Sequence, residues 1–292
     1  MNFNNLLQEK NINPEHVIVL RHRPYESQLN KVLPWLATTR PDLFNAYQQA
    51  QGKKLEKSMN ELEKIGYVAS FIGQESGKAL FIGLYSIARS KPITYKEYWN
   101  IKANVELKSL GMIGFQGERE TLLWFDLAPT DFYPLWKGKL VIGWTPPERS
   151  WWRRAHKNEF PVYAIHEDSL LESDMPSWDI INLSWEELGV LPTRWKSALS
   201  QWRGIYYIFD TSDGKGYVGS AYGKENILGR WLNYAANGSG GNRLLRKRNS
   251  QNFRFTILQR VSPDMLPAEI IRLENTWKER LHSRKPFGLN DN

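Results

Sequence analysis

Phenol hydroxyls gather in one short stretch near the end of the sequence. Tyr206 and Tyr207 lie in a β-rich run, and Tyr217 lies in a second run that follows the polar turn Asp213–Gly216. Glycine supplies the positive φ that tight turns need, and aromatic residues favour strands, so the stretch predicts a β-hairpin. Side chains alternate along a strand, so only one phenol of the adjacent pair can join Tyr217 on one face.

Charged side chains that suit a phosphodiester follow this hairpin. Arg230 and Tyr234 are four residues apart in a predicted helix and therefore share one of its faces. Glu274, in a second predicted helix over 267–281, can hold one Mg²⁺, a hard cation that keeps most of its waters. The guanidinium can clamp a phosphate through two hydrogen bonds, and Lys224 adds positive potential. These groups together could neutralise the transition state of phosphodiester hydrolysis.

One module carries all of these groups. Residues 202–292 are predicted to run as a hairpin, a helix, a third strand over 253–259, a second helix and a closing Asn290. This order resembles the GIY-YIG endonuclease family, with Val218 in place of the signature isoleucine. The resemblance implies that 196–292 form a small antiparallel three-stranded sheet flanked by helices.

The resemblance also implies a role for each residue of the site. Tyr206 is expected to act as general base, with Tyr217 and Tyr234 positioning the water, and Asn290 is expected to hold the glutamate helix to the hairpin. Many family members carry His where this sequence has Tyr234, whereas the excision-repair incision subunits carry Tyr. The expected catalytic set is Tyr206, Tyr217, Lys224, Arg230, Tyr234, Glu274 and Asn290, with Glu274 binding one Mg²⁺ or Mn²⁺ ion and Glu269 as its replacement in another helix register.

Proton transfer by phenols has a consequence for pH dependence. A phenol titrates near about 10, so Tyr206 or Tyr234 can act as a base only if neighbouring cations lower its pKa. Because Tyr234 removes the usual histidine, we expect an activity optimum on the alkaline side. Among the five histidines, His282 is read as an exposed helix-end residue, and no spacing indicates a metal cluster.

Positive charge is concentrated in the last third of the chain. Residues 1–200 carry 24 basic and 23 acidic side chains, whereas residues 201–292 carry 15 and 8, which accounts for the net charge of +8. Such a field suits nucleic acid, although an ordinary solvated surface is an equally good explanation. The residues predicted to contact nucleic acid here are Arg243, Arg246, Lys247 and Arg248.

The region before this module, 1–195, is predicted to be a larger α+β domain that selects the substrate. Residues 1–66 read as mostly helical, and residues 67–165 read as β-rich and barrel-like. Tryptophan and arginine could stack on and clamp an unpaired base, while the alternative is that the tryptophans fill and cover the barrel. The candidates for that contact are Trp151, Trp152, Arg153 and Arg154.

Composition excludes several classes of protein. The chain has no cysteine, which excludes disulfides, thiol nucleophiles, zinc fingers and iron–sulfur clusters. No apolar run approaches the ~20 residues that span a membrane, and no signal peptide is apparent, so a cytoplasmic protein is expected.

These observations favour one function and leave two alternatives. The expected function is a metal-dependent DNA endonuclease in restriction or anti-phage defence, whose N-terminal domain selects DNA by sequence, structure or base modification. It would act as a homodimer or as a transient pair on DNA, because two nicks in a duplex usually call for two active sites. The alternatives are a non-cleaving nucleic-acid-binding protein and an excision-repair-type nickase.

Overall fold

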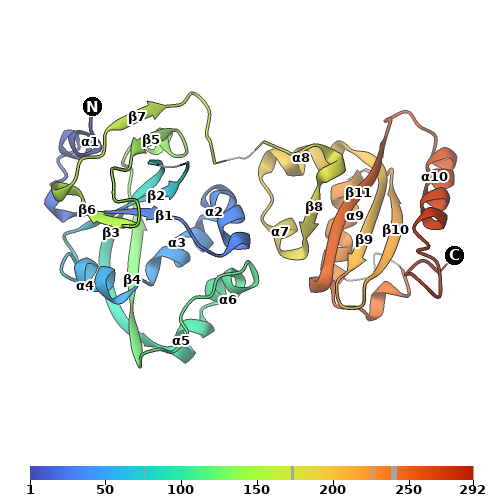
Figure 1. The fold of residues 1–292 in the computed structure, drawn as a ribbon, viewed down its shortest axis with the longest axis horizontal. Helices are drawn as coiled ribbons and strands as arrows, with labels where there is room; N and C mark the ends of the chain where they lie inside the picture. The colour runs from blue at the N-terminus through green and yellow to red at the C-terminus, as the bar shows by residue number, and fades with distance from the viewer. Residues whose placement is uncertain (76, 172–173, 225, 238–241, 292) are drawn as a thin grey trace. The chain divides into compact units, whose positions relative to one another are not determined.

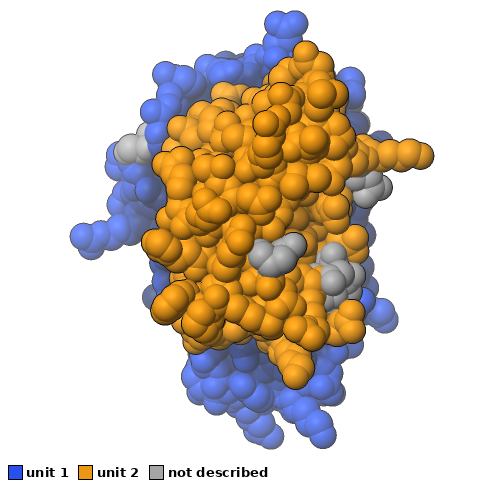
Figure 2. All heavy atoms as spheres, turned by 90° about the vertical axis from the view of Figure 1, so that its right-hand side faces the viewer, with its two compact units in different colours: residues 1–172 blue, residues 173–292 orange. Residues whose placement is uncertain are grey.

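The β-strands of the chain pair into two separate sheets. The computed structural model describes residues 1–75, 77–171, 174–224, 226–237 and 242–291. It divides into two compact units, Met1–Glu172 and Ser173–Asn292, which are coloured separately in Figure 2. The predicted boundary between 195 and 196 falls inside the second unit, because β8 (Asn182–Ser184) pairs with β11 (Phe253–Val261).

The first unit is built on a seven-stranded sheet that curls into a half-barrel (Figure 1). Its strands are β1 (Val17–His22), β2 (Tyr67–Gly73), β3 (Lys78–Thr94), β4 (Thr121–Pro129), β5 (Leu140–Gly143), β6 (Trp152–Arg154) and β7 (Val162–Ile165). The order is β6-β1-β2-β3-β5-β7, and β4 pairs with β3. Within the described residues β6 and β7 are not paired with each other, so the barrel-like region that we predicted is an open sheet.

Residues 1–66 are mostly helical, as predicted, and the strand β1 is the element in this segment that the prediction did not include. All six of its residues are buried, and it pairs in parallel with β2 from Val17↔Tyr67 to His22↔Ile72. Val19 belongs to the core cluster that contains Phe3 of α1 (Phe3–Glu9), while Ile18 points to the opposite face and is also buried. A strand buried on both faces shows no alternation of apolar and polar residues, which is why the pattern missed it.

Short helices surround this sheet. Besides α1 they are α2 (Ser27–Thr39), α3 (Pro41–Gln49), α4 (Lys53–Asn60), α5 (Tyr95–Asn100) and α6 (Lys102–Ser109). The 3-10 turns of this unit are Pro14–His16, Pro134–Trp136 and Ala155–Lys157. The helix α5 begins where Thr94 accepts the N–H of Glu97 and the Glu97 carboxylate accepts the N–H of Thr94, a capping box. The first unit is therefore mixed α+β.

The second unit is built on a four-stranded antiparallel sheet of order β10-β9-β11-β8. The strands β9 (Arg203–Asp210) and β10 (Lys215–Ala221) form the predicted hairpin, and β8 adds a fourth strand to the three that we predicted. The helices are α7 (Trp185–Gly189), α8 (Thr193–Gln201), α9 (Asn226–Asn237) and α10 (Pro267–Arg280), with 3-10 turns at Trp178–Ile180, Leu245–Lys247 and Ser250–Asn252.

The helices α9 and α10 cover opposite faces of this sheet (Figure 1). Ile270 of α10 packs with Ile205 and Val218, whereas Trp231 of α9 packs on Phe255 at a ring-centroid distance of 5.7 Å. Since β10 is an edge strand, side chains from both helices can approach it. None of the helices in the described part of the chain is long and apolar enough to cross a membrane.

Candidate active site

Three phenols meet on the face of the sheet that α9 covers. Tyr206 comes from β9, Tyr217 from β10 and Tyr234 from α9, and their ring centroids are 5.6 to 6.5 Å apart. The hydroxyl of Tyr206 donates to that of Tyr234 at 3.4 Å, and both of these side chains are buried. Tyr207 points to the other face, where it packs near Ile205 and α10. The choice between the adjacent tyrosines is thus made by the alternation of the strand.

The absence of a side chain at Gly219 leaves room for the Tyr206 ring. Gly219 lies opposite Tyr206 in the hairpin register, and a Cβ built at this position would stand 2.5 Å from the Tyr206 hydroxyl oxygen and 2.6 to 2.8 Å from ring carbons. Contacts this short do not occur between a real Cβ and its neighbours. The absent side chain therefore lets the phenol lie across the edge strand.

Burial and charge have opposing effects on these phenols. Burial raises the pKa of Tyr206 well above its ordinary value of 10, the neighbouring Tyr234 and Tyr217 raise it further, and Arg230 lowers it. The pKa of Tyr217 is raised by burial first, then by Tyr234 and by the charge of Glu274, while Arg230 again lowers it. Burial outweighs the cation, so both phenols keep their protons near neutrality. The condition stated for a phenolate base, a pKa lowered by neighbouring cations, is therefore not met at Tyr206 or Tyr217 in this structure.

Glu274 reaches β10 from the opposite face. One carboxylate oxygen, Oε2, accepts from the hydroxyl of Ser220, and the other, Oε1, pairs with Nζ of Lys278 at 2.8 Å. Lys278 is 5% and Glu274 16% exposed. Glu269 instead caps the start of α10 through the N–H of Leu266, so the register of the helix presents Glu274 to the hairpin.

Ser220 and Lys278 are contacts that the sequence reading missed. Lys278 follows Glu274 by four residues in a helix, a spacing that brings side chains together, so this pair could have been found from the sequence. Ser220 follows the hairpin glycine directly but carries no pattern of its own. Both residues hold the carboxylate in one orientation.

The donor set around Glu274 fits a single hard cation. The described residues contain no group of three or more His, Cys, Asp or Glu side chains that could hold an ion. A carboxylate has about four lone-pair sites, and Lys278 and Ser220 use two of them. Mg²⁺ keeps most of its waters and binds through one or two carboxylates plus substrate phosphate, and Glu274 would supply one such carboxylate.

The side chain of Asn290 hydrogen-bonds to the backbone of the edge strand β10. Its Oδ1 accepts the N–H of Val218 at 2.9 Å, and its Nδ2 donates to the carbonyl of Val218 at 2.8 Å. The hydroxyl of Ser283, just after α10, donates to the same Oδ1 at 2.7 Å. A single buried carboxamide thus ties the end of the glutamate helix to the hairpin.

The remaining cations differ in what they contact. Lys224 and Arg230 are exposed at the start of α9 and in its first turns. Arg248 pairs at 2.7 Å with the buried Asp210 and also with Asp213, so it braces the turn of the hairpin. Among the other predicted contacts, Arg243 pairs with Asp291 at 3.0 Å, whereas Arg246 and Lys247 are exposed and form no ion pair with described residues.

The four predicted contacts of the first unit also separate. Arg153 is buried and donates to the Thr145 hydroxyl and to the carbonyls of Thr145 and Pro147, and Arg154 pairs with Glu61. Trp152 is half-buried in β6, and Trp151 is 39% exposed beside a cavity. Both arginines are therefore engaged inside the unit, and Trp151 is the member of the set that faces a cavity.

No protein-family model matches this chain, and no curated protein matches it. Two solved structures do. They are the catalytic domain of the homing endonuclease I-TevI, at 31% sequence identity, and a mutant of the catalytic domain of the intron endonuclease I-TevI, at 29%. Each match covers 31% of this chain and 98% or 94% of the I-TevI chain, with TM-scores of 0.26 and 0.27. Over this 31% of the chain, the resemblance to the GIY-YIG endonuclease family is confirmed.

Proposed function

We propose that this protein is a DNA endonuclease that hydrolyses phosphodiester bonds with the help of one Mg²⁺ or Mn²⁺ ion. The first unit would select the DNA, and the role would be restriction or anti-phage defence. The observation that carries the proposal is the arrangement around β10: three clustered phenols beside Arg230 on one face, and Glu274 held by Lys278 and Ser220 on the other.

Each of these groups has a separate task in the proposed reaction. Arg230 is exposed at the edge of the phenol cluster, where its guanidinium can clamp the scissile phosphate through two hydrogen bonds. Glu274 would hold the metal ion, which when bound polarises a phosphate oxygen as a Lewis acid. Glu274 and the Tyr206–Tyr234 pair are held by hydrogen bonds before the substrate arrives, and such preorganised polar groups supply the larger part of catalysis in many enzymes.

The phenols would handle the proton of the attacking water. The Tyr206 hydroxyl donates to Tyr234, so its lone pairs point away from that bond and can accept from a water. In this relay Tyr206 Oη would take the proton of the water while passing its own proton to Tyr234 Oη, and Tyr234 would pass its proton to the leaving oxygen of the phosphodiester, so that both rings stay neutral. This replaces the free phenolate that the sequence suggested, because burial raises the pKa of Tyr206.

Cleavage of plasmid and phage DNA tests the proposal. The wild type should nick or cut DNA in Mg²⁺ and not in EDTA, and Glu274→Ala or Arg230→Ala should lower the rate by about 10²–10³-fold, as expected for one group that stabilises the transition state. Glu279→Ala, an exposed acid on the same helix, is the matched control and should keep full activity. If the wild type leaves modified and unmodified DNA intact, the protein is a non-cleaving binder.

The same assay decides between an endonuclease that cuts both strands and a nickase. Tyr234, which occupies the position where the excision-repair subunits have tyrosine, favours the nickase. A nickase gives relaxed circles that persist at high protein concentration, whereas paired active sites give linear DNA. Light scattering with and without DNA would show whether linear product coincides with a dimer.

A further inference from the structure

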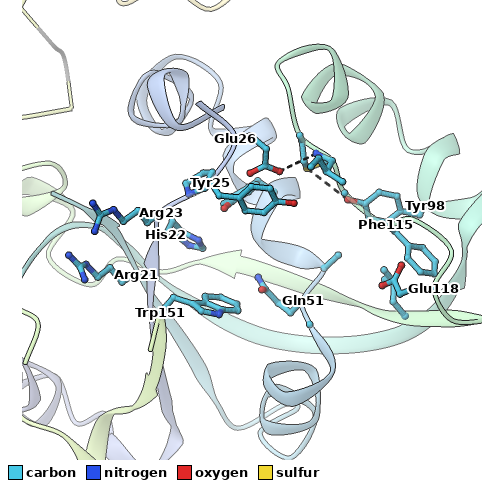
Figure 3. A pocket seen from close by; sticks show the side chains of 18 of the residues that line it. Arg21, His22, Arg23, Tyr25, Glu26, Gln51, Tyr98, Phe115, Glu118 and Trp151 are labelled. Atoms are coloured by element: carbon cyan, nitrogen blue, oxygen red, sulfur yellow. Dashed lines mark hydrogen bonds between the residues drawn. The ribbon is translucent and has the colours of Figure 1, made fainter. Parts of the chain in front are cut away.

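A cavity of about 430 Å³ opens in the first unit at the end of β1 (Figure 3). Its walls come from segments far apart in the sequence: the loop after β1, the turn between α3 and α4, α5, the loop after α6, and the residues before β6. Its volume lies within the range of about 300–1,000 Å³ that is common for sites of small organic ligands. None of the contacts in the proposed cleavage site uses it.

Aromatic rings face each other across this cavity. Figure 3 shows Trp151 on one side and Tyr25 on the other, with Tyr98 and Phe115 closing the far end. Trp151 is 39% and Tyr25 81% exposed, so two large rings stand at the mouth without a covering partner in this unit, whereas Tyr98 and Phe115 are buried. Exposed rings on two sides of an opening suit a flat aromatic ligand that stacks between them.

Polar groups in the wall are placed to read the edge of such a ligand. Glu26 accepts the N–H of Ile113 with Oε1 at 3.2 Å, and Oε2 has no hydrogen-bond partner among the residues that the structure describes. The Gln51 amide lies across the cavity from Glu26 in Figure 3. A carboxylate oxygen and an amide oxygen both accept hydrogen bonds, so amino groups are the natural partner.

His22 is a second, independent sign of a ligand. Its ring lines the cavity, it is 3% exposed, and its Nε2 has no hydrogen-bond partner within the described part of the chain. The ring is held by edge contacts with Phe44 and Tyr47 at 5.5 and 5.3 Å. Buried polar atoms are nearly always satisfied in folded proteins, so an orphan in a cavity wall points to a ligand atom that would complete it.

The arginines around the mouth of the cavity differ in whether they form ion pairs within the unit. Arg119 pairs with Glu56 at 2.6 Å and donates to the carbonyl of Gln51, and Arg21 pairs with Glu148 at 3.5 Å. Arg23 is exposed at the rim and has no ion pair with any described residue. A free guanidinium beside an aromatic cavity suits a phosphate attached to the ligand.

We propose that this cavity receives one nucleobase that has left the DNA helix, and that it prefers bases with an exocyclic amino group, such as cytosine, adenine or a substituted form of either. The base would stack between Trp151 and Tyr25, present its amino group to Glu26, and leave its phosphate beside Arg23. This inference rests on the proposed function, because it takes DNA as the source of the base.

Binding without cleavage tests the inference. Fluorescence anisotropy in EDTA would compare three duplexes that differ at one central position: a paired cytosine, a cytosine opposite an abasic site, and an abasic site in place of the cytosine. An orphan base costs less to extrude than a paired one. We therefore expect the orphan-cytosine duplex to bind about tenfold more tightly than the other two, and an orphan thymine to show little of this gain.

Matched variants test whether the tighter binding of the orphan-cytosine duplex comes from the cavity. Trp151→Ala and the nearly isosteric Glu26→Gln should remove this gain, whereas Tyr163→Ala and Glu159→Gln, which change an exposed ring and an exposed acid outside the cavity, should keep it. Melting temperatures would verify that each variant is folded. If Glu26→Gln is folded and keeps the full preference for cytosine, the proposed reading of the amino group is wrong.

Two outcomes would overturn the proposal. One is equal binding of the three duplexes by the wild type. The other is displacement of the orphan-base duplex by free cytidine monophosphate at similar concentration, which would make the cavity a site for free nucleotides rather than for DNA. Neither result depends on cleavage. The proposal for the cavity can therefore be wrong while the proposed nuclease function is right. Conversely, a failure to cut plasmid DNA would not affect the measured preference for an orphan cytosine.

Discussion

The two candidate sites differ in how far their polar side chains are satisfied. Around β10 the carboxylate and the carboxamide both have partners: Glu274 contacts Lys278 and Ser220, and Asn290 pairs with the Val218 backbone. Around the cavity of the first unit, Trp151 stands exposed and Nε2 of His22 lacks a hydrogen bond to any described residue. A site that performs chemistry benefits from groups that are fixed in advance, whereas a site that recognises a ligand leaves groups for that ligand to complete.

Removing Lys278, the cation beside Glu274, should have the largest effect. It leaves a carboxylate of the β10 site without its ion pair and so tests the first half of the comparison. Lys278→Met keeps an unbranched side chain of similar size but leaves a largely buried carboxylate without its ion pair, so we expect a loss of about 3 kcal/mol in the free energy of unfolding. Urea titration measures it. Adding Glu274→Gln should restore most of the loss, because the remaining pair is neutral; a double variant no more stable than Lys278→Met would contradict the account.

Low pH should reduce the stability of the folded protein through His22, the cavity residue whose Nε2 has no partner among the described residues. Burial lowers the pKa of His22 from 6.5 to about 4, so the folded protein keeps this ring neutral where the unfolded chain protonates it. The unfolded state then binds more protons between these values, and stability is complete above about pH 6.5 and falls by about 3 kcal/mol as the pH drops to about 4.

The control for this effect is a histidine at the surface. His22→Phe should flatten the pH dependence of unfolding between pH 6.5 and 4, measured by urea titration at each pH, whereas replacing the exposed His156 should leave it unchanged. Equal slopes for wild type and His22→Phe would show that another group governs acid unfolding. Since His22 lines the cavity, the same variant would also report on ligand binding.

Adding one methyl group at Gly219 tests whether the proposed reaction depends on the position of the Tyr206 ring. Gly219→Ala puts a Cβ against the Tyr206 phenol, so the ring must move out of the relay, and we expect cleavage to fall by about a hundredfold. Gly189→Ala is the matched control, because nothing lies within 4 Å of a Cβ there. Single-turnover rates would be compared. Full activity in Gly219→Ala would mean that the Tyr206 position is unimportant for catalysis.

Local patterns predicted the hairpin and the two helices that carry Arg230 and Glu274, and they missed contacts made across the chain. Tyr217 was found because strand alternation is local, whereas Glu274 was assigned by the resemblance to the GIY-YIG family. β8 was missed because it has three residues, Asn182–Ser184, and owes its existence to pairing with β11. The partner of Arg248, Asp210, lies 38 positions away, and no periodicity in either segment indicates that pair.

The first unit was harder to predict for the same reason. Its cavity is assembled from five separate segments, each of which reads as an ordinary loop or helix end. Trp151 was singled out by composition, but the sequence gives no sign that it faces Tyr25, which lies 126 positions earlier in the chain. Arg153, predicted to clamp a base, is instead buried against Thr145 and Pro147 because the chain turns back on itself there.

The carboxamide of Asn290 has a consequence for how copies of this protein meet. An edge strand normally offers a row of free N–H and C=O groups on which another chain can add a strand. At Val218 one side chain takes both of these groups, and the N–H of Leu289 takes the carbonyl of Gly216. The middle of β10 is thereby closed to strand addition, so the hairpin that carries the phenols is protected from aggregation by the same residue that orients it.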